Sequence, residues 1–254
     1  MNKIAVITGA SGDVGSCIAL ELIKSNYTCI LVGTSLKKLQ NKFADYNRYN
    51  IHYFELDFED HIKIKNVCEK IIKTIGIPDI IINCAGIGGF QPISELTINT
   101  VSKVININLV ATMLFTQMFI PYLIKQNAGQ IINIESIAAI KGFSYGASYV
   151  ASKFGLEGFS QVLREELQPY NIKVCTIKPG LINTSFFKDL SIELPSSIEL
   201  ALSPDDISYI VKMIINQSDR SNICDIVVRP LKYESKNTFY EILSKAFGDS
   251  NNKN

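Results

Sequence analysis

The chain has 254 residues, 47% of them hydrophobic, and its 25 basic and 24 acidic residues leave a formal net charge of +1. This length can bury one sizeable core, and the balanced charge gives no basic face for binding nucleic acid. The apolar runs are strand-sized and the N-terminus enters a predicted strand at once, so we expect no membrane span, no signal peptide and a cytoplasmic location. Six cysteines without C-x-x-C spacing and only two histidines predict reduced thiols and no metal site.

Apolar segments alternate with helical stretches along the chain. This order predicts a parallel sheet with helices on both faces, and near-continuous Ile, Val and Leu runs are typical of strands buried on both sides. With no internal repeat or linker, we expect one α/β domain over residues 1–248 and a disordered polar tail at 249–254. The predicted strands are Ile4–Thr8, Thr28–Val32, Ile51–Leu56, Ile80–Asn83, Gln130–Ile134, Lys173–Ile177 and Asp225–Val228.

The first predicted strand runs directly into a glycine-containing turn, residues 9–15, and then into a helix with apolar periodicity. Strand, turn and helix together form a phosphate-binding unit. The glycines let backbone N–H groups approach a pyrophosphate, and the helix directs its positive dipole end at the same charge. Because such turns also cap ordinary helices, this segment alone is a weak indication of dinucleotide binding.

Tyr149 and Lys153 are four residues apart in a predicted helix and therefore share one face. A tyrosine normally loses its proton near pH ~10, and a neighbouring ammonium group favours the phenolate and lowers this pKa. The pair is a candidate for general acid chemistry. On its own, a Y-x-x-x-K sequence is more often part of an ordinary surface helix.

Several short motifs occur in one order: Thr8-Gly9-x-x-x-x-x-Gly15, Asn83-Cys84-Ala85-Gly86, Asn108, Ser136, Tyr149-x-x-x-Lys153 and Pro179-Gly180. Their order and intervals resemble the short-chain dehydrogenase/reductase family of the Tyr-x-x-x-Lys type, over nearly the whole chain. Several weak motifs in one order are far more specific than any single one. The resemblance implies a single-domain, Rossmann-type, doubly wound parallel sheet and an NAD(P)(H)-dependent oxidoreductase.

The resemblance also implies four catalytic roles. Tyr149 would give the carbonyl oxygen its proton, Ser136 would hold that oxygen, and Lys153 would lower the Tyr149 pKa and bind the nicotinamide ribose. Asn108 would distort its helix and hold a water in the proton relay. The residues themselves leave Asn106 and Asn108 both open, because each is a poor helix former in an apolar stretch and a buried amide needs a partner.

Three positions depart from the family pattern. Cys84 replaces the second asparagine of N-N-A-G, and Glu135 stands where the family often has another serine. Asp13 replaces the middle glycine of the turn, and we expect it to turn away from the pyrophosphate and cap the following helix. Glu135 should point away from Ser136, because side chains alternate along a strand, and we assign it no catalytic role.

The same resemblance implies the cofactor contacts. They would border the phosphates in the glycine turn, follow the second, third and fourth strands, and include the active-site pair and the segment after Pro179-Gly180. Asp57, placed by the family beside the adenine, could equally be a turn or capping residue. The expected contacts are Gly9, Ser11, Val14, Thr34, Lys37, Asp57, Asn83, Ala85, Gly86, Tyr149, Lys153, Ile182 and Thr184.

The end of the second strand should decide between NAD and NADP, because an acid there binds the ribose hydroxyls and a basic residue binds a 2′-phosphate. This chain has Thr34 and Ser35 there, with Lys37 and Lys38 just beyond. Two ammonium groups and no carboxylate favour NADP(H). NAD(H) stays an alternative, since both lysines could be solvated helix residues.

The expected substrate is a small-molecule ketone or secondary alcohol, or a 3-oxoacyl compound. The pocket walls should come from residues 87–92, 138–146 and a lid near 183–203. The apolar lid favours a hydrophobic ketone, although the same side chains could pack on the core. Two nearby lysines leave a carboxylate or an acyl-carrier substrate open. These side chains are Phe186, Phe187, Leu190 and Leu194, and the lysines are Lys141 and Lys188.

A homodimer or homotetramer is expected from the resemblance, because the family usually pairs the Asn108 and Tyr149 helices across a two-fold axis. An apolar stripe over residues 239–246 should pack on this subunit or on a partner. Small residues on the Tyr149 helix would allow close packing of helices. They are Ala147, Ala151, Gly155 and Gly158.

Two other functions remain as alternatives. The first is a dinucleotide-sensing regulatory protein, because a fold does not fix a function. The complete set of Ser136, Asn108, Tyr149 and Lys153 argues against it, since a sensor would not need these residues. The second is an epimerase or dehydratase with a transient hydride or proton step, for which the chain gives no special support.

Overall fold

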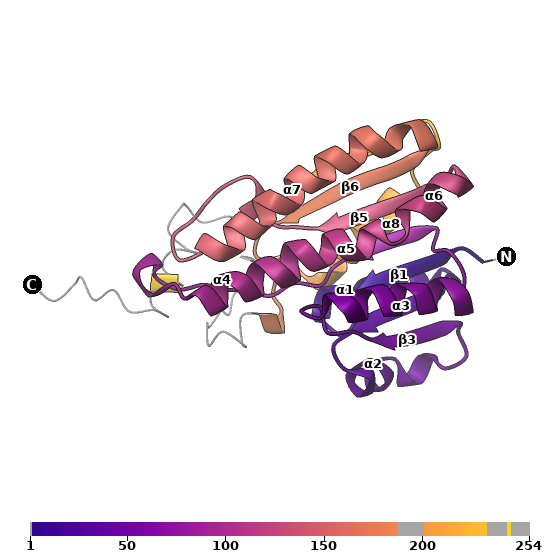
Figure 1. The fold of residues 1–254 in the computed structure, drawn as a ribbon, viewed down its shortest axis with the longest axis horizontal. Helices are drawn as coiled ribbons and strands as arrows, with labels where there is room; N and C mark the ends of the chain where they lie inside the picture. The colour runs from indigo at the N-terminus through magenta and orange to yellow at the C-terminus, as the bar shows by residue number, and fades with distance from the viewer. Residues whose placement is uncertain (1, 187–200, 233–242, 245–254) are drawn as a thin grey trace, which may run out of the picture.

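A parallel sheet forms the centre of the protein (Figure 1). The computed structural model describes residues 2–186, 201–232 and 243–244. The strands follow the order β3-β2-β1-β4-β5-β6-β7, and each neighbouring pair is parallel. The predicted fold class is confirmed, and the predicted strand bounds are close to the observed ones. The strands are β1 (Ile4–Thr8), β2 (Thr28–Gly33), β3 (Ile51–Glu55), β4 (Ile80–Asn83), β5 (Gly129–Ile134), β6 (Ile172–Pro179) and β7 (Asp225–Val228).

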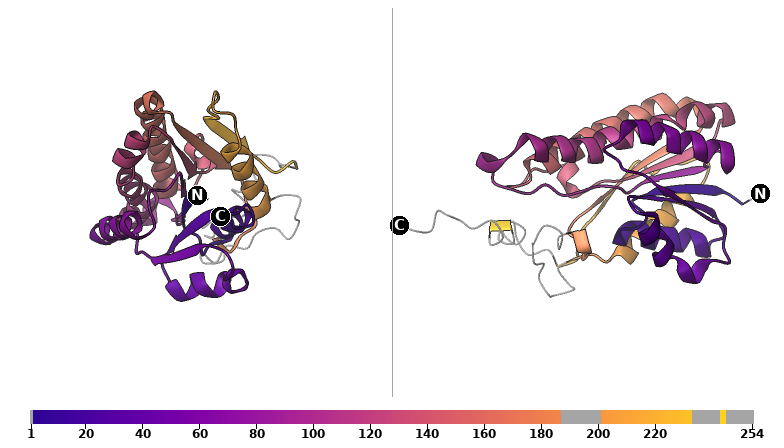
Figure 2. Two further views of the ribbon diagram at one scale, coloured as in Figure 1. Left: turned by 90° about the vertical axis from the view of Figure 1, so that its right-hand side faces the viewer. Right: turned by 60° about the horizontal axis from the view of Figure 1, so that its bottom comes forward.

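Helices cover both faces of the sheet and give three layers (Figures 1 and 2). They are α1 (Asp13–Lys24), α2 (Leu36–Lys42), α3 (His61–Thr74), α4 (Ile98–Ile105), α5 (Ala111–Gln117), α6 (Ile120–Gln126), α7 (Ala147–Leu167) and α8 (Pro204–Ile215). One apolar cluster joins the sheet to α1, α2 and α8, and a second joins its other face to α3, α5, α6 and α7.

Successive residues of a strand face opposite layers. In β1, Ala5 and Ile7 belong to the cluster with α1 and α8, whereas Val6 belongs to the cluster with α3 and α7. All three side chains are fully buried. Because both faces of the sheet are covered, apolar residues occupy consecutive positions rather than alternating with polar ones.

The sheet has a topological switch point at β1: β2 and β3 are added on one side of it, and β4 to β7 are added on the other. β1 lies between β2 and β4, so the loops after β1 and β4 separate and leave a crevice at their carboxyl ends. The Thr8 hydroxyl ties these ends together, accepting the backbone N–H groups of Cys84 at 3.0 Å and Ala85 at 3.2 Å. The fold therefore brings the glycine turn beside residues 84–87.

One helical run differs from the sequence-based expectation of strand-sized apolar segments. Ile98–Gln117 joins α4, a π-helical turn η3 (Asn106–Val110) and α5, and by length and composition it could cross a membrane. Core helices of soluble proteins share these properties, so the run is weak support for a membrane span. In this fold it contacts α3 and α7 and carries the buried amide of Asn108.

Two of the small residues predicted at a subunit interface have different surroundings. A Cβ atom added at Gly155 would lie 2.7 Å from Cδ2 of Leu109, so this glycine serves the packing of α7 on η3 within one chain. At Gly158 an added Cβ would meet no heavy atom within 4 Å among the described residues. Of the two, only Gly158 remains available for close approach of another helix.

Parts of two predicted segments lie outside the described residues. Residues 187–200 hold Phe187, Lys188, Leu190 and Leu194 of the predicted lid, and residues 245–254 include the predicted tail. From the predicted C-terminal stripe, Leu243 is described. It is fully buried against Phe90 of the same chain. The division of the chain at residue 248 stays a prediction.

Candidate active site

A cleft of about 640 Å³ opens at the carboxyl ends of β1, β4 and β5. Its wall runs from the glycine turn across the ends of β2 and β4 to α7 and the segment after β6. Of the predicted site residues, Ser11, Lys37, Asn83, Asn108 and Ser136 are not part of this wall. Those that line it are Gly9, Val14, Thr34, Asp57, Ala85, Gly86, Tyr149, Lys153, Ile182 and Thr184.

The glycine turn packs so tightly that side chains are excluded from two of its positions. Gly9 has φ of +67°, and a Cβ atom there would lie 2.8 Å from the backbone N and Cα of Ala85. A Cβ at Gly15 would lie 2.3 Å from the carbonyl oxygen of Gly9. The bare backbone and the N-terminus of α1 form a cradle that suits the pyrophosphate of a dinucleotide.

Asp13 does not cap α1, contrary to expectation. Gly12 is the N-cap residue, and the Asp13 carboxylate instead accepts the backbone N–H and the hydroxyl of Ser185 at 2.7 and 2.8 Å. Lys42 of α2 lies 3.5 Å from the same carboxylate. Burial raises the pKa of Asp13, but the bonds from Ser185 and the charge of Lys42 outweigh it and hold the pKa below its usual value. A carboxylate is therefore fixed at the wall of the cleft.

We expect Asp13→Asn to raise the affinity for a dinucleotide by about threefold, because it removes a negative charge from the wall of the cleft beside the glycine turn. The asparagine Oδ1 can still accept the Ser185 N–H, so the turn should keep its shape. Fluorescence titration with NADPH measures the change. Lys63→Gln, which removes an exposed charge on α3, is the control, and an unchanged or lower affinity of Asp13→Asn would contradict this prediction.

Asn108 is the buried asparagine of its helix, fully enclosed in the π-helical turn, whereas Asn106 is partly exposed. Its Oδ1 accepts the Ile87 N–H at 2.8 Å, and its Nδ2 donates to the Ile87 carbonyl and the Ser152 hydroxyl, each at 3.0 Å. The predicted helix distortion is present at this residue. The amide connects the loop after β4 with α7.

Tyr149 and Ser136 meet at the end of β5. The Ser136 side chain hydrogen-bonds to Tyr149 and also accepts the Ala138 N–H at 3.1 Å, which fixes its orientation. The Tyr149 ring packs against Phe90 and Phe186, with centroid distances of 5.2 and 6.1 Å. The hydroxyl groups of Ser136 and Tyr149 are therefore neighbours beside the cleft.

Lys153 was expected to lower the Tyr149 pKa, but this pKa lies above its usual value in the structure. Burial raises the pKa of Tyr149 to about 12, although the bond from Ser136 opposes this change. The Lys153 ammonium donates to the Ile134 carbonyl at 3.1 Å and lies 5.7 Å from the tyrosine ring centroid. Burial also lowers the pKa of Lys153 itself, against the opposing charge of Glu135.

The residues near the end of β2 are only partly those expected. Thr34 lines the cleft, but Lys37 does not, and Lys42 is the cation that approaches the glycine turn, 3.5 Å from the Ser11 carbonyl. Asp57 accepts the Glu59 N–H at 3.0 Å, so it is a turn residue and also part of the wall. No sequence pattern distinguishes Lys42 from Lys37 or Lys38, because its approach depends on how α2 folds back.

Asn83 is buried and links the strand end beside the cleft to neighbouring elements. Its Nδ2 donates to the Thr116 hydroxyl at 2.9 Å and to Asn133 Oδ1 at 2.8 Å, which joins β4 to α5 and β5. Cys84, which follows it, lines the cleft with a thiol whose pKa burial raises to about 12. Asn83 therefore holds the sheet, and it does not line the cleft.

Several wall residues were missed by sequence reasoning. Most are direct neighbours of predicted residues at strand ends, so the position after each strand was a usable signal. Lys103 and Ile107 reach the cleft from the helical run, and the sequence contains no signal for them. Ile87, Ser185 and Phe186 lie in the segments predicted as pocket walls, and the missed residues are Gly12, Asp13, Gly15, Gly33, Phe58, Glu59, Cys84, Lys103, Ile107, Ile134 and Glu135.

The switch-point cleft, the glycine cradle and the paired hydroxyls define a protein of the dinucleotide-binding α/β class. The family model described as short chain dehydrogenase matches residues 3–194. A 3-ketodihydrosphingosine reductase of Bacteroides thetaiotaomicron is 35% identical over 184 residues, 72% of this chain and 65% of that relative. An uncharacterized oxidoreductase of Staphylococcus aureus is 28% identical over 91% of this chain and 98% of its own.

Two solved structures have the same fold. The closed form of serine dehydrogenase complexed with NADP+ has a TM-score of 0.85 at 26% identity, covering 92% of this chain and 97% of that one. A metagenomic short-chain oxidoreductase in complex with NADP has a TM-score of 0.78 at 28% identity, covering 91% and 97%. The chain belongs to the short-chain dehydrogenase family, and it is an oxidoreductase acting on CH–OH or carbonyl groups.

Proposed function

We propose that this protein transfers hydride between NADP(H) and the carbonyl or secondary alcohol of an apolar small molecule, as a ketone reductase. The observation that carries the proposal is the meeting of the Ser136 and Tyr149 hydroxyls beside the cleft, with Lys153 one helical turn from Tyr149. Two hydroxyls at one point can bind a single carbonyl oxygen, and the phenol can also give it a proton.

The residues of the cleft fit the cofactor that this reaction requires. Gly9 and Gly15 leave room for a pyrophosphate, Thr34 and Asp57 border the adenosine end, and Ile182 borders the nicotinamide end. Val14, Ala85, Gly86 and Thr184 complete the proposed set, together with the active-site pair, whereas Ser11 and Asn83 lie outside the wall. When bound, the dinucleotide supplies or accepts the hydride.

The protein's own groups handle the proton. With a pKa of about 12, Tyr149 holds its proton at neutral pH and can donate it to the oxygen of a ketone. Ser136 orients that oxygen, and Lys153 supplies positive charge that stabilises the phenolate left behind. Asn108 hydrogen-bonds to Ile87 and to Ser152, the residue before Lys153, and we propose that it connects Lys153 to solvent through water.

The substrate is proposed to have a hydrophobic body. Phe90, Phe143, Phe186 and Leu243 pack around Tyr149 in a third apolar cluster, so the region next to the reacting hydroxyls is largely aromatic. A relative named for 3-ketodihydrosphingosine reduction supports a ketone with an apolar chain. A 3-oxoacyl substrate is the second candidate within the same reaction class.

NADP(H) is proposed as the preferred cofactor over NAD(H). Thr34 and Ser35 place small polar residues at the end of β2, and Lys42 brings an ammonium group to the Ser11 carbonyl. The Ser35 hydroxyl itself accepts the Lys38 N–H at 3.3 Å and caps α2. The two NADP-bound relatives of known structure agree with this choice.

The test is a fluorescence titration with NADPH and NADH, followed by turnover of a panel of ketones that differ in chain length. We expect tighter binding of NADPH and higher kcat/KM for apolar ketones than for acidic ones. Binding without turnover of any ketone or 3-oxoacyl thioester would favour the regulatory function. Cofactor that stays bound through purification, without net oxidation or reduction, would favour an epimerase or dehydratase.

A cytoplasmic homodimer or homotetramer is proposed from the family's usual assembly. Phe154 of α7 and Met113 of α5 leave apolar side chains exposed on neighbouring helices, with exposed fractions of 46% and 39%. Light scattering at micromolar concentration tests the assembly, and a monomeric mass would contradict it.

A further inference from the structure

Glu135 is a buried carboxyl group directly beside the reacting residues that has no place in the proposed mechanism. It follows β5, precedes Ser136 and is only 4% exposed. Its Oε1 lies 3.1 Å from the Ser160 hydroxyl of α7. Among the residues that the structure describes, its Oε2 is buried without a hydrogen-bond partner. A carboxylate in this position would leave a negative charge poorly compensated.

The position of Glu135 also differs from the sequence-based expectation. Alternation along a strand was expected to place it opposite Ser136, but both residues contact α7, one at Ser160 and the other at Tyr149. The reason is that β5 ends at Ile134, so the alternation does not extend to these two residues. Glu135 is therefore close enough to act electrostatically on Tyr149 and Lys153, and it also forms part of the wall of the cleft.

The Ser160 hydroxyl is a poor hydrogen-bond partner for an ionised Glu135. The Ser160 hydroxyl has one hydrogen, and its oxygen lies 2.8 Å from the Leu156 carbonyl, which can only accept. The same oxygen accepts Nδ2 of Asn133 at 2.8 Å. The hydroxyl also donates to Glu135 Oε1 at the longer distance of 3.1 Å, so its one hydrogen is shared between two acceptors and Glu135 receives only a weak hydrogen bond.

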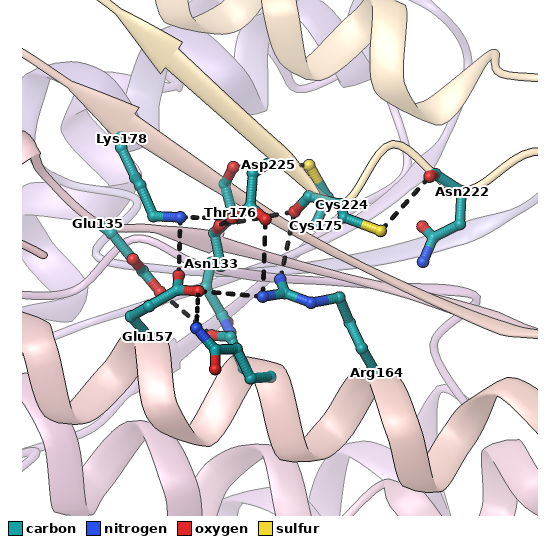
Figure 3. A network of polar contacts seen from close by, with 12 residues as sticks. Asn133, Glu135, Glu157, Arg164, Cys175, Thr176, Lys178, Asn222, Cys224 and Asp225 are labelled. Carbon is teal, nitrogen blue, oxygen red and sulfur yellow. Dashed lines mark hydrogen bonds and ion pairs between the residues drawn. The ribbon is translucent and has the colours of Figure 1, made fainter. Parts of the chain in front are cut away.

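The charged groups around Glu135 do not compensate an ionised form. On β6, Lys178 pairs with Glu157 at 2.8 Å and with Asp225, and on α7 Arg164 pairs with Glu157 at 3.0 Å (Figure 3). Of the described ion pairs, none joins a cation to Glu135. Glu157 faces it as a like charge, and Lys153 is bonded to the Ile134 carbonyl.

We propose that Glu135 is a neutral carboxylic acid at neutral pH, and that its ionisation controls the proton affinity of the Tyr149 and Lys153 pair. It is a positioning residue, because it acts on the reaction through these two groups. Burial and the charge of Glu157 raise the pKa of Glu135 to about 8, against the opposing effects of Lys153 and Lys178. The part that concerns reaction rates depends on the proposed function.

The consequence differs between the two directions of the reaction. Once Glu135 loses its proton, its negative charge raises the pKa of Tyr149 and disfavours the phenolate. Alcohol oxidation needs the phenolate as the base, so its rate should rise less with pH above about pH 8 than Tyr149 alone would allow. Ketone reduction uses the neutral phenol and should not be slowed by this ionisation.

The first test measures protonation of Glu135 without any substrate. Infrared spectra of the protein at about pH 6 and about pH 10, on either side of the pKa, should show a protonated carboxyl C=O stretch that disappears at high pH. The signal should be absent in Glu135→Gln. In Glu157→Gln it should disappear at lower pH than in the wild type, because a like charge has been removed. A signal missing at about pH 6, or one that persists in Glu135→Gln, would overturn the proposal.

The second test compares the pH dependence of kcat in both directions. Glu135→Gln keeps a neutral group of the same shape, so we expect ketone reduction near pH 7 within about twofold of wild type. Alcohol oxidation above pH 9 should become faster in this variant, on the order of tenfold, with a steeper pH profile. If the pH profiles of kcat for wild type and Glu135→Gln coincide, Glu135 does not control the proton affinity of the pair. The same conclusion holds if Glu135→Gln loses ketone reduction at neutral pH while it still binds NADPH. If no ketone is turned over, the proposed function fails, while the infrared result still decides whether Glu135 is a neutral acid.

Discussion

Tyr149→Phe is expected to lower kcat for ketone reduction by about 10²–10⁴-fold, because it removes the proton that the carbonyl oxygen must receive. The ring itself packs against Phe90 and Phe186, so phenylalanine should fit the same space without a change in fold. Single-turnover kinetics with saturating NADPH would measure the loss in the chemical step.

The control for this change is Tyr209→Phe, which removes a phenol hydroxyl from the exposed face of α8, where the side chain is 71% exposed. It should leave kcat unchanged, and the Kd for NADPH should stay within about twofold in both variants. Substantial turnover by Tyr149→Phe would mean that another group donates the proton, and the assignment of Tyr149 would then be wrong.

Gly15→Ala is expected to weaken NADPH binding by at least about tenfold and to destabilise the fold by about 1–3 kcal/mol, the usual cost of overpacking. The added methyl group would lie 2.3 Å from the Gly9 carbonyl oxygen and 3.1 Å from Cα of Ala10. Since these are backbone atoms, the turn itself must move. Urea unfolding and NADPH titration measure the two effects.

Gly158→Ala is a matched control on α7, where an added Cβ would meet no described heavy atom within 4 Å. There the same substitution should stabilise the protein by roughly 0.5–1 kcal/mol, because alanine is the better helix former. If Gly15→Ala kept both its affinity and its stability, the close contact between the glycine turn and the start of α1 could not be required for the site.

Local patterns predicted the strands and most of the cleft. The apolar runs fixed the seven strands, and the order of motifs located Tyr149, Lys153 and Ser136 correctly relative to one another. Parallel sheets have loops at predictable edges, so residues after strand ends, such as Thr34 and Ala85, could be placed beside the ligand from sequence alone.

The errors concern contacts between distant segments. Asp13 was expected to cap its own helix, but Ser185, which is 172 residues away, supplies its hydrogen bonds. The Tyr149 pKa was expected to be low from the nearby lysine, but burial among residues from other segments outweighs that charge. Lys42 was missed, and Glu135 was placed wrongly, for the same reason, since their partners come from elements that the sequence does not place in space.

The bond from the Thr8 hydroxyl to residues 84 and 85 has a consequence for the order in which the molecule can assemble. The two halves of the cleft are 76 residues apart along the chain, and β4 must pair with β1 before Ala85 can lie against Gly9. Closing so long a loop is slow compared with forming local helices. During synthesis, a nascent chain that ends before β4 has the glycine turn but only one wall of the cleft. Tight dinucleotide binding should therefore begin only after β4 has emerged from the ribosome and joined the sheet.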